Sequence, residues 1–350
     1  MTEASFAKAG ILSAVLVVCF FTSWEHYLRS KHIGISYEDG DALWEDKRAM
    51  VYEPADKSTV FIGSSRNKYD IDISTWQAIT GDHVVQLAIE GNSPLPVLDD
   101  LASDDQFNGK LIIDVTEILF FTTADKNISE PKTRIAYYKK RTPAQRFSFL
   151  VNRQLESRLV FLDKNYFSLN ALLQNIPLQK RKGVFALPYD CPRDFGPVSF
   201  DRQNIMTDRF LTDTIVQNQV KGLWDFYRKT GKEPPADQHK ADSIIATVKT
   251  NIDKIKSRGG QIIFVRTPSS GPFLMGEKMA YPREKYWDRL LSATGIPGIH
   301  FEDYQAIAHF VCPEFSHLKQ ADAVVFTKNI IKILEREKGW KFVKSPVKAD

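Results

Sequence analysis

The residue types best suited to covalent chemistry are a serine early in the chain and a histidine near its end. The serine, Ser65, stands in the turn Gly63-Ser64-Ser65-Arg66, and the histidine, His317, follows Glu314 by three residues. A carboxylate at this spacing can hold one ring nitrogen of the histidine while the other acts as general base to a serine hydroxyl. Taken singly, Ser65 is typical of a turn, and His317 of a helix-start histidine with a satisfied core hydrogen bond. A catalytic site therefore requires that the fold bring them together.

Five apolar runs could supply the sheet that does so. Each run is short, nearly continuous and bounded by turn residues, which is typical of strands buried on both faces of a parallel sheet. The runs are 59–62, 83–89, 110–115, 261–265 and 298–302. Helical patterns lie between or after them, over 93–101, 242–258 and 319–338. This alternation predicts a doubly wound α/β domain.

The carboxyl ends of such strands are where open α/β sheets bind ligands. Ser65 lies just beyond the first predicted strand and Gly91 just beyond the second, while Glu314 and His317 precede the last predicted helix. Gly91 has no side chain, so its backbone N–H could approach a developing oxyanion. The joint placement of these four residues favours a catalytic site at this edge of the sheet.

The arrangement resembles the SGNH (GDSL-like) hydrolases, over about 58–120 and 258–336. The segments VFIGSSR, VRTPSSGPF, YPREKYW and EFSHL are similar to membrane-anchored bacterial members, including proteins similar to the D-alanine transfer protein and to alginate O-acetyltransferase accessory proteins. The resemblance implies a flavodoxin-like parallel sheet with Ser65 as nucleophile, His317 as base and Glu314 as its orienting group. It also implies an oxyanion hole made by the N–H groups of Ser65 and Gly91.

Three positions depart from the pattern of that family. Ser64 and Glu314 each stand where an aspartate is usual, and the third strand runs into 114–117, Asp-Val-Thr-Glu, where the family has Gly-x-Asn-Asp. The asparagine that donates to the oxyanion is therefore missing, and Asn92 is the substitute donor that the sequence offers. The longer side chain of Glu314 could still reach the histidine.

Arginines, histidine spacings and glycine-rich motifs bear on whether the chain binds an anionic substrate, a metal or a cofactor. Three arginines near the predicted site could neutralise an anionic substrate or form structural salt bridges: Arg66, Arg266 and Arg283. The spacings of His300, His309 and His317 have no metal-ligand logic. The chain has no Walker A loop and no GxGxxG sequence. We therefore expect no metal and no cofactor.

Composition narrows the class of protein. The chain has 350 residues, of which 43% are apolar and 26% charged, so collagen-like, coiled-coil and mostly disordered chains are excluded. Its net charge of +4 falls short of the concentrated basic face of a nucleic-acid binder. We expect no nucleic-acid partner.

The N-terminus predicts a membrane anchor. Residues 9–24 carry no charge, and extension back to residue 4 gives a run long enough to cross a bilayer once. We predict an uncleaved signal anchor over 4–24; a cleaved signal peptide and a buried helix are the alternatives. Lys8 and the α-amino group favour a cytoplasmic N-terminus, which would place the rest of a single-pass protein in the periplasm.

The remainder divides into four predicted segments: a linker or docking segment over 25–57, an α/β domain over 58–338, an insertion in it over 120–240, and a frayed basic tail over 339–350. The insertion is expected to be largely helical, with a basic face over 131–160. That face is either a solvated helical surface or a surface for anionic lipid headgroups, an envelope polymer or a membrane partner.

The predicted compartment decides whether the cysteines can form a disulfide. Cys19 falls in the anchor and is expected to be inert. Cys191 and Cys312 form an even pair in an oxidising compartment, so a disulfide between them is a hypothesis.

Two functions remain open at this stage. The first is a serine-dependent O-acyltransferase or esterase of envelope polysaccharide, which carries the acyl group on Ser65. A membrane-bound O-acyltransferase would be its partner and a carbohydrate the acceptor, and sequence cannot separate transfer from hydrolysis. The second is a catalytically inactive assembly subunit that keeps the fold, a hypothesis motivated by the missing asparagine and by glutamate in place of aspartate at 314.

Overall fold

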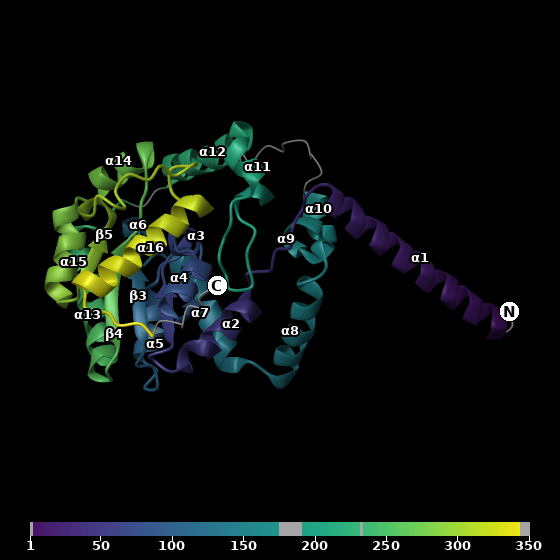
Figure 1. The fold of residues 1–350 in the computed structure, drawn as a ribbon, viewed down its shortest axis with the longest axis horizontal. Helices are drawn as coiled ribbons and strands as arrows, with labels where there is room; N and C mark the ends of the chain where they lie inside the picture. Colours follow the sequence, from purple (N-terminus) through teal and green to yellow (C-terminus); the bar gives the residue numbers. More distant parts are fainter. Residues whose placement is uncertain (1–2, 175–190, 232–233, 344–350) are drawn as a thin grey trace, which may run out of the picture. The chain divides into compact units, whose positions relative to one another are not determined.

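The computed structural model describes residues 3–174, 191–231 and 234–343 (Figure 1). Contacts divide the chain into two units. Unit 1 comprises Met1–Glu38 and Pro143–Phe185, and unit 2 comprises Asp39–Thr142 and Ala186–Asp350. The segment predicted as one insertion over 120–240 is thus shared between the two units.

Unit 2 is built on a five-stranded sheet in which every pair of neighbours is parallel. The strands are β1 Ser58–Ile62, β2 His83–Gln86, β3 Lys110–Asp114, β4 Gln261–Arg266 and β5 Gly298–His300. Their order is β2-β1-β3-β4-β5, one of the two common doubly wound orders. The predicted α/β class and the parallel sheet are confirmed.

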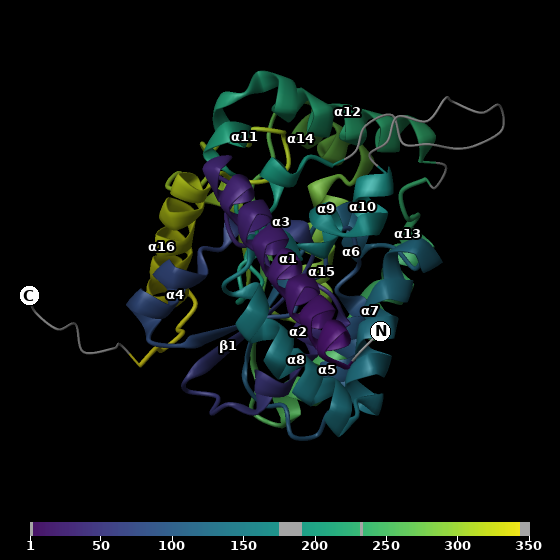
Figure 2. The ribbon, with the colours of Figure 1, turned by 90° about the vertical axis from the view of Figure 1, so that its right-hand side faces the viewer.

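Alternate residues of each strand feed two separate cores, as the two-residue period of a strand requires. On β1, Val60 and Ile62 join the core under α5 (Leu95–Ala102), α13 (Gln238–Ser257) and α15 (Trp287–Thr294). Phe61 joins the opposite core, under α4 (Ile73–Thr80) and α16 (Gln320–Glu337). In Figure 2, α4 and α16 lie together on one side of the sheet, and α13 lies on the other.

The chain between β3 and β4 is largely helical. Unit 2 holds α6 (Glu117–Phe120), α7 (Asp125–Lys140), η3 (Arg193–Phe195), α11 (Asp208–Thr212), α12 (Thr214–Thr230) and α13; unit 1 holds α8 (Pro143–Glu156), η2 (Val160–Leu162), α9 (Lys164–Phe167) and α10 (Leu169–Gln174). Among the described residues of 120–240, the only β-type pairing is the isolated bridge between Val198 and Asn204. Asp213 caps α12 and Asp237 caps α13 by accepting backbone N–H groups.

The remaining elements complete both units. Unit 2 also contains α2 (Asp41–Ala49), η1 (Met50–Tyr52), α3 (Ser65–Asp70), α14 (Gly271–Ala280), η4 (Arg283–Lys285) and η5 (Phe301–Asp303). Unit 1 begins with α1 (Glu3–Ser30), which is the one helix among the described residues that is long and apolar enough to cross a membrane. It continues six residues beyond the predicted anchor end at Trp24.

Two of the predicted segments pack on the α/β core. In the predicted linker or docking segment, Trp44 is fully buried and its Nε1–H donates to the Leu87 carbonyl at 3.0 Å. The start of the predicted tail is also packed: Trp340 is buried, and Phe342 lies edge-on to Trp76 with ring centroids 5.6 Å apart. Residues 344–350 of that tail lie outside the described residues.

Candidate active site

The turn that presents Ser65 is fixed by a close approach between β1 and β3. A Cβ at Gly63 would lie 2.5 Å from the Asp114 Cβ, so only glycine fits there. The next residue, Ser64, donates through its hydroxyl to Asp114 Oδ2 at 3.1 Å and lies 2.9 Å from the Thr116 hydroxyl. Ser64 is therefore held beneath the turn, and Ser65, at the start of α3, is half-exposed. Ser64 is thus a partner of an aspartate on the neighbouring strand.

The structure brings Ser65, His317 and Glu314 into one hydrogen-bonded line. Ser65 Oγ lies 2.9 Å from His317 Nε2, and His317 Nδ1 lies 3.0 Å from Glu314 Oε1. The serine is separated from the histidine by 252 positions along the chain. These distances are those of a nucleophile, a base and a group that orients the base.

Glu314 is held by donors on both of its oxygens. Its Oε1 accepts from the backbone N–H groups of Ser316 at 3.3 Å and His317 at 2.7 Å, and its Oε2 accepts from Trp224 Nε1–H at 2.5 Å. Burial alone would raise the pKa of Glu314, but attraction to His317 and these hydrogen bonds outweigh it and keep the pKa below its usual range. Glu314 is therefore a carboxylate, which can only accept, so the hydrogen-bond network places a proton on His317 Nδ1. When Nε2 carries no proton, it can accept the proton of the Ser65 hydroxyl.

Three aromatic rings surround His317, and none of them was among the predicted site residues. The ring centroids of Tyr69, Phe195 and Trp224 lie 4.5, 5.6 and 6.2 Å from that of the imidazole. Phe195 and Trp224 belong to the segment between β3 and β4, so part of the predicted insertion builds the site. No sequence period links Trp224 to Glu314, which is why its role could not be predicted.

The turn that carries Glu314 and His317 is strained. Phe315 has φ +79°, in the left-handed region that non-glycine residues rarely adopt. Its carbonyl accepts from the Ser270 N–H at 2.9 Å, and its ring lies against Gly271, where a Cβ would meet the ring at 3.0 Å. Backbone strain of this kind is concentrated at functional sites.

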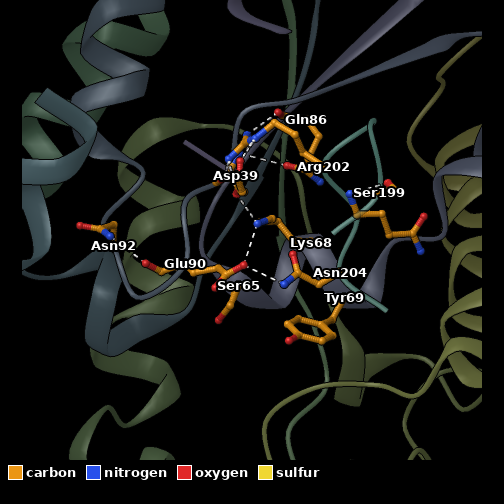
Figure 3. Close-up of polar contacts among 12 residues, drawn as sticks. Asp39, Ser65, Lys68, Tyr69, Gln86, Glu90, Asn92, Ser199, Arg202 and Asn204 are labelled. Atoms are coloured by element: carbon orange, nitrogen blue, oxygen red, sulfur yellow. Dashed lines mark hydrogen bonds and ion pairs between the residues drawn. The ribbon is translucent and has the colours of Figure 1, made fainter. Parts of the chain in front are cut away.

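The loop after β2 carries two of the predicted oxyanion residues, Gly91 and Asn92. Gly91 is exposed with φ +66°, and its N–H has no acceptor within the described part of the chain. The prediction that Asn92 supplies a side-chain donor does not fit the structure. Its Nδ2 donates to the Glu90 carbonyl at 2.7 Å and to Glu130 Oε2 at 3.0 Å. In Figure 3 the Asn92 side chain lies beyond Glu90 as seen from Ser65.

The three arginines predicted to bind an anionic substrate have carboxylate partners in the chain. Arg66 is buried and paired with Glu277; buried Arg266 pairs with Glu117 at 3.1 Å and Glu277 at 2.6 Å. Arg283 is more exposed and pairs with Asp303 at 2.5 Å. The three therefore form structural ion pairs, and the predicted role in neutralising a substrate does not fit them.

The lining of a cavity beside Arg266 and Arg283 also argues against binding of an anionic substrate. It has a volume of about 420 Å³, and Arg266, Lys278 and Arg283 line it together with Glu117, Glu277, Glu284 and Glu302. Four carboxylates thus face three cations, which does not favour an anionic ligand. His300 also lines the cavity; burial, with the nearby cation Arg266, lowers the pKa of His300 to about 3, so it is neutral.

A second polar cluster lies next to the candidate site (Figure 3). Asp39 accepts from Arg202 Nε at 2.5 Å and from Lys68 Nζ at 2.5 Å, and Lys68 Nζ also donates to Glu90 Oε1 at 2.7 Å. Arg202 donates further to the carbonyl groups of Gln86 at 2.6 Å and Ala88 at 2.9 Å. Burial alone would raise the pKa of Asp39, but the cations around it hold that pKa far below its usual range. We call Asp39, Lys68, Glu90 and Arg202 the Asp39 cluster.

Asp70, at the end of α3, is a buried carboxyl close to the catalytic histidine candidate. Its Oδ1 accepts from the Leu318 N–H at 2.8 Å. Burial raises its pKa to about 7, although attraction to His317 acts in the opposite direction.

The predicted disulfide between Cys191 and Cys312 is not formed. Cys312 is buried with its Sγ 3.8 Å from the Pro268 carbonyl, whereas Cys191 is exposed. Burial raises the pKa of the Cys312 thiol well above its ordinary value, so it is a protonated, inert side chain.

Metal ligands are not gathered within the ranges that the structure describes, since no group of three or more His, Cys, Asp or Glu residues there could hold an ion. We compared the chain with protein-family models and with curated protein sequences. Neither comparison gave a match.

Proposed function

We propose that the chain is a serine-dependent O-acyltransferase or esterase of the SGNH type that acts on cell-envelope polysaccharide. The observation that carries the proposal is the line from Ser65 through His317 to Glu314, with both hydrogen bonds at 3.0 Å or less. The doubly wound sheet order and the position of Ser65 after β1 support the assignment to that hydrolase type.

In the first half of the proposed reaction, Ser65 Oγ attacks the carbonyl carbon of an acyl donor while His317 Nε2 takes its proton. Glu314 stabilises the imidazolium that forms, and the N–H groups of Ser65 and Gly91 donate to the developing oxyanion. His317 then returns the proton to the leaving group, which leaves the acyl group as an ester on Ser65.

In the second half, His317 removes a proton from a sugar hydroxyl or from water, and the oxygen attacks the carbonyl carbon of the ester. The bond from that carbon to Ser65 Oγ then breaks, and His317 returns the proton to the serine oxygen. The sugar gives transfer and water gives hydrolysis by the same steps. We propose that α1 anchors the protein as a single-pass protein in the inner membrane, with unit 2 in the periplasm. There it would meet a membrane-bound O-acyltransferase that supplies the acyl group and a carbohydrate that accepts it.

A fluorophosphonate probe tests the central step, because it phosphonylates only an activated serine. We expect stoichiometric labelling of the full chain in detergent, with the adduct mapped to Ser65 by mass spectrometry, and no labelling of Ser65→Ala. Ser64→Ala is the matched control: its hydroxyl contacts Asp114 rather than the histidine, so labelling should persist. An adduct on Ser64, or labelling that survives in Ser65→Ala, would contradict the proposal.

The second candidate is an inactive assembly subunit of an envelope polysaccharide complex. The observation that favours it is that the Asn92 amide, the predicted side-chain oxyanion donor, donates to Glu130 instead. Well-folded protein that never reacts with the probe would support this candidate over the enzyme.

A further inference from the structure

Helix α8 in unit 1 presents an apolar face to solvent. Phe147, Leu150, Val151 and Leu155 are 69, 53, 44 and 45% exposed. At 100° per residue these four side chains fall on one side of the helix, and none of the residues in α8 is buried. Contiguous exposed apolar side chains of this kind mark surfaces that contact a protein or a membrane.

The position of α8 along the chain ties it to the candidate membrane helix. Shortly after α8 ends, the backbone N–H groups of Val160 and Phe161 donate to Glu25 of α1 at 3.0 and 3.1 Å. The Phe161 ring stacks on Phe21 of α1 with centroids 5.0 Å apart, and Arg29 donates to the Arg158 carbonyl at 2.7 Å. The C-terminal end of α8 is therefore fastened to the last turns of α1, which projects away from it in Figure 1.

These contacts set the depth of α8 in a bilayer. Trp24 and Tyr27 stack next to Glu25 with centroids 5.7 Å apart, and such rings mark the boundary between hydrocarbon and headgroups. Phe21 lies four residues, about 6 Å, nearer the bilayer centre. Phe161, stacked on Phe21, is thus at the edge of the hydrocarbon. The C-terminal end of α8, which lies five residues before Phe161, is therefore expected near the same depth in the bilayer.

The length and charge of α8 suit a helix that lies along the surface. Its 14 residues are too few to span a bilayer, which needs about 20. Arg146 and Arg153 stand beside the apolar stripe, and no acidic residue occurs from 143 to 155. Basic residues flanking an apolar face are typical of helices bound to anionic lipid surfaces.

We propose that α8 lies in the headgroup region of the membrane that α1 crosses, with its apolar stripe among the acyl chains and its arginines against anionic phosphate groups. The inference rests on the proposed anchoring by α1. It adds a second membrane attachment, which fixes unit 1 against rotation about α1.

Depth-dependent quenching tests this in the full chain. The protein is placed in nanodiscs of equal parts phosphatidylcholine and phosphatidylglycerol that carry a nitroxide lipid, and single cysteines are labelled with a fluorophore. All proteins carry Cys191→Ser, and Cys312 is buried and unreactive. Leu150→Cys reports the apolar stripe, Asn152→Cys is the matched control away from that stripe, and both also carry Cys19→Ser. Native Cys19, exposed on α1, reports the anchor.

We expect a shallow nitroxide to quench the label at position 150 several-fold more than the label at 152, and a central nitroxide to quench the label at Cys19. Equal quenching at 150 and 152 while Cys19 is quenched would overturn the inference and leave the anchor intact. Absence of quenching at Cys19 would overturn the anchoring and the inference with it. Shielding of position 150 only in native membranes would assign the stripe to a protein partner and overturn the lipid assignment. Equal quenching at 150 in nanodiscs of phosphatidylcholine alone would overturn the role of anionic lipid.

Discussion

Helix α3 contributes to two clusters of largely buried polar side chains that differ in the charges of their groups. Through Ser65 it joins His317 and Glu314; through Lys68 it joins the Asp39 cluster. In the Asp39 cluster every charge faces fixed opposite charges: a carboxylate between arginine and lysine, and a lysine between two carboxylates. In the line from Ser65 through His317 to Glu314, which we call the Ser65 line, a hydroxyl meets an imidazole backed by one carboxylate.

We therefore expect the Asp39 cluster to affect mainly the stability of the fold, and the Ser65 line to affect mainly reactivity. Removing one partner from a buried ion network leaves an uncompensated charge, which costs several kcal/mol of folding free energy. The Ser65 line contains one fixed charge, the Glu314 carboxylate, and a proton can pass between the hydroxyl and the imidazole, which lie within hydrogen-bond distance. Buried polar residues with movable protons are therefore the ones to test for chemistry.

The largest expected effect is on reactivity at His317. His317→Ala should lower the rate of fluorophosphonate labelling by about a thousandfold or more, because the base is lost. Glu314→Gln should cost less, since the amide removes an orienting group and leaves the base. Labelling kinetics of the folded proteins measure both. Equal losses in the two variants would mean that Glu314 does more than orient the histidine.

Arg202→Met should show the opposite pattern. It leaves Asp39 and two backbone carbonyl groups without their main donor, so we expect the free energy of unfolding to fall by about 3–5 kcal/mol. The labelling rate of the folded fraction should change by less than about tenfold, because no group of the Ser65 line is touched. Urea denaturation and labelling kinetics on the same preparation would check this. A large loss of labelling in Arg202→Met without a loss of stability would contradict the proposed difference between the two clusters.

Asp70→Asn tests the buried carboxyl next to His317. The pKa of Asp70 is about 7 in the folded chain and lower when unfolded, so the folded state keeps a proton between about pH 4 and 7 that the unfolded state has lost. Stability should therefore fall as pH rises through this window, by at most about 4 kcal/mol. Asparagine cannot titrate, so the variant should lose this part of the dependence. Denaturation curves near pH 5 and pH 8 compare the two. An unchanged difference between the two pH values would refute the role of Asp70.

Trp224→Phe should give the smallest effect. The ring is retained but the donor to Glu314 Oε2 is lost, and a hydrogen bond to a charged group contributes about 1.5–3 kcal/mol. Because other donors still hold Glu314, we expect only about a tenfold slower labelling. Tyr227→Phe, on the same helix, is the matched control and should label normally. A rate equal to that of the parent would show that the 2.5 Å contact has no influence on the histidine.

The sequence carries most of the information on the sheet and on the central line of the site. Apolar runs mark all five strands because these strands are buried on both faces. The carboxyl-end rule then predicts that Ser65 and His317 meet, and the structure brings them together at 2.9 Å.

The side chains that contact the site residues are harder to predict from the sequence, because these contacts depend on packing between elements that are distant along the chain. The engagement of Asn92 requires Glu130 on α7, and the pairing of Arg66 and Arg266 requires Glu277 on α14. Nothing in the local sequence around these residues records such neighbours. The same holds for Trp224, whose indole reaches Glu314 across 90 positions.

Each of the six residues of α3 bonds to a side chain or backbone group elsewhere in unit 2, and Ser65 and Asp70 bond to neighbouring residues, His317 and Leu318. Beyond Ser65, Arg66 and Lys68, Asn67 accepts from Gln86 at 3.0 Å, Tyr69 donates to the Phe195 carbonyl at 3.2 Å, and Asp70 accepts from Leu318. A helix tied down in this way has no independent motion: the hydroxyl of Ser65 can shift only if several distant parts of unit 2 shift with it. Its amide protons should exchange with solvent among the slowest in the protein, and the stretch 65–70 should tolerate few substitutions even where they spare the serine itself.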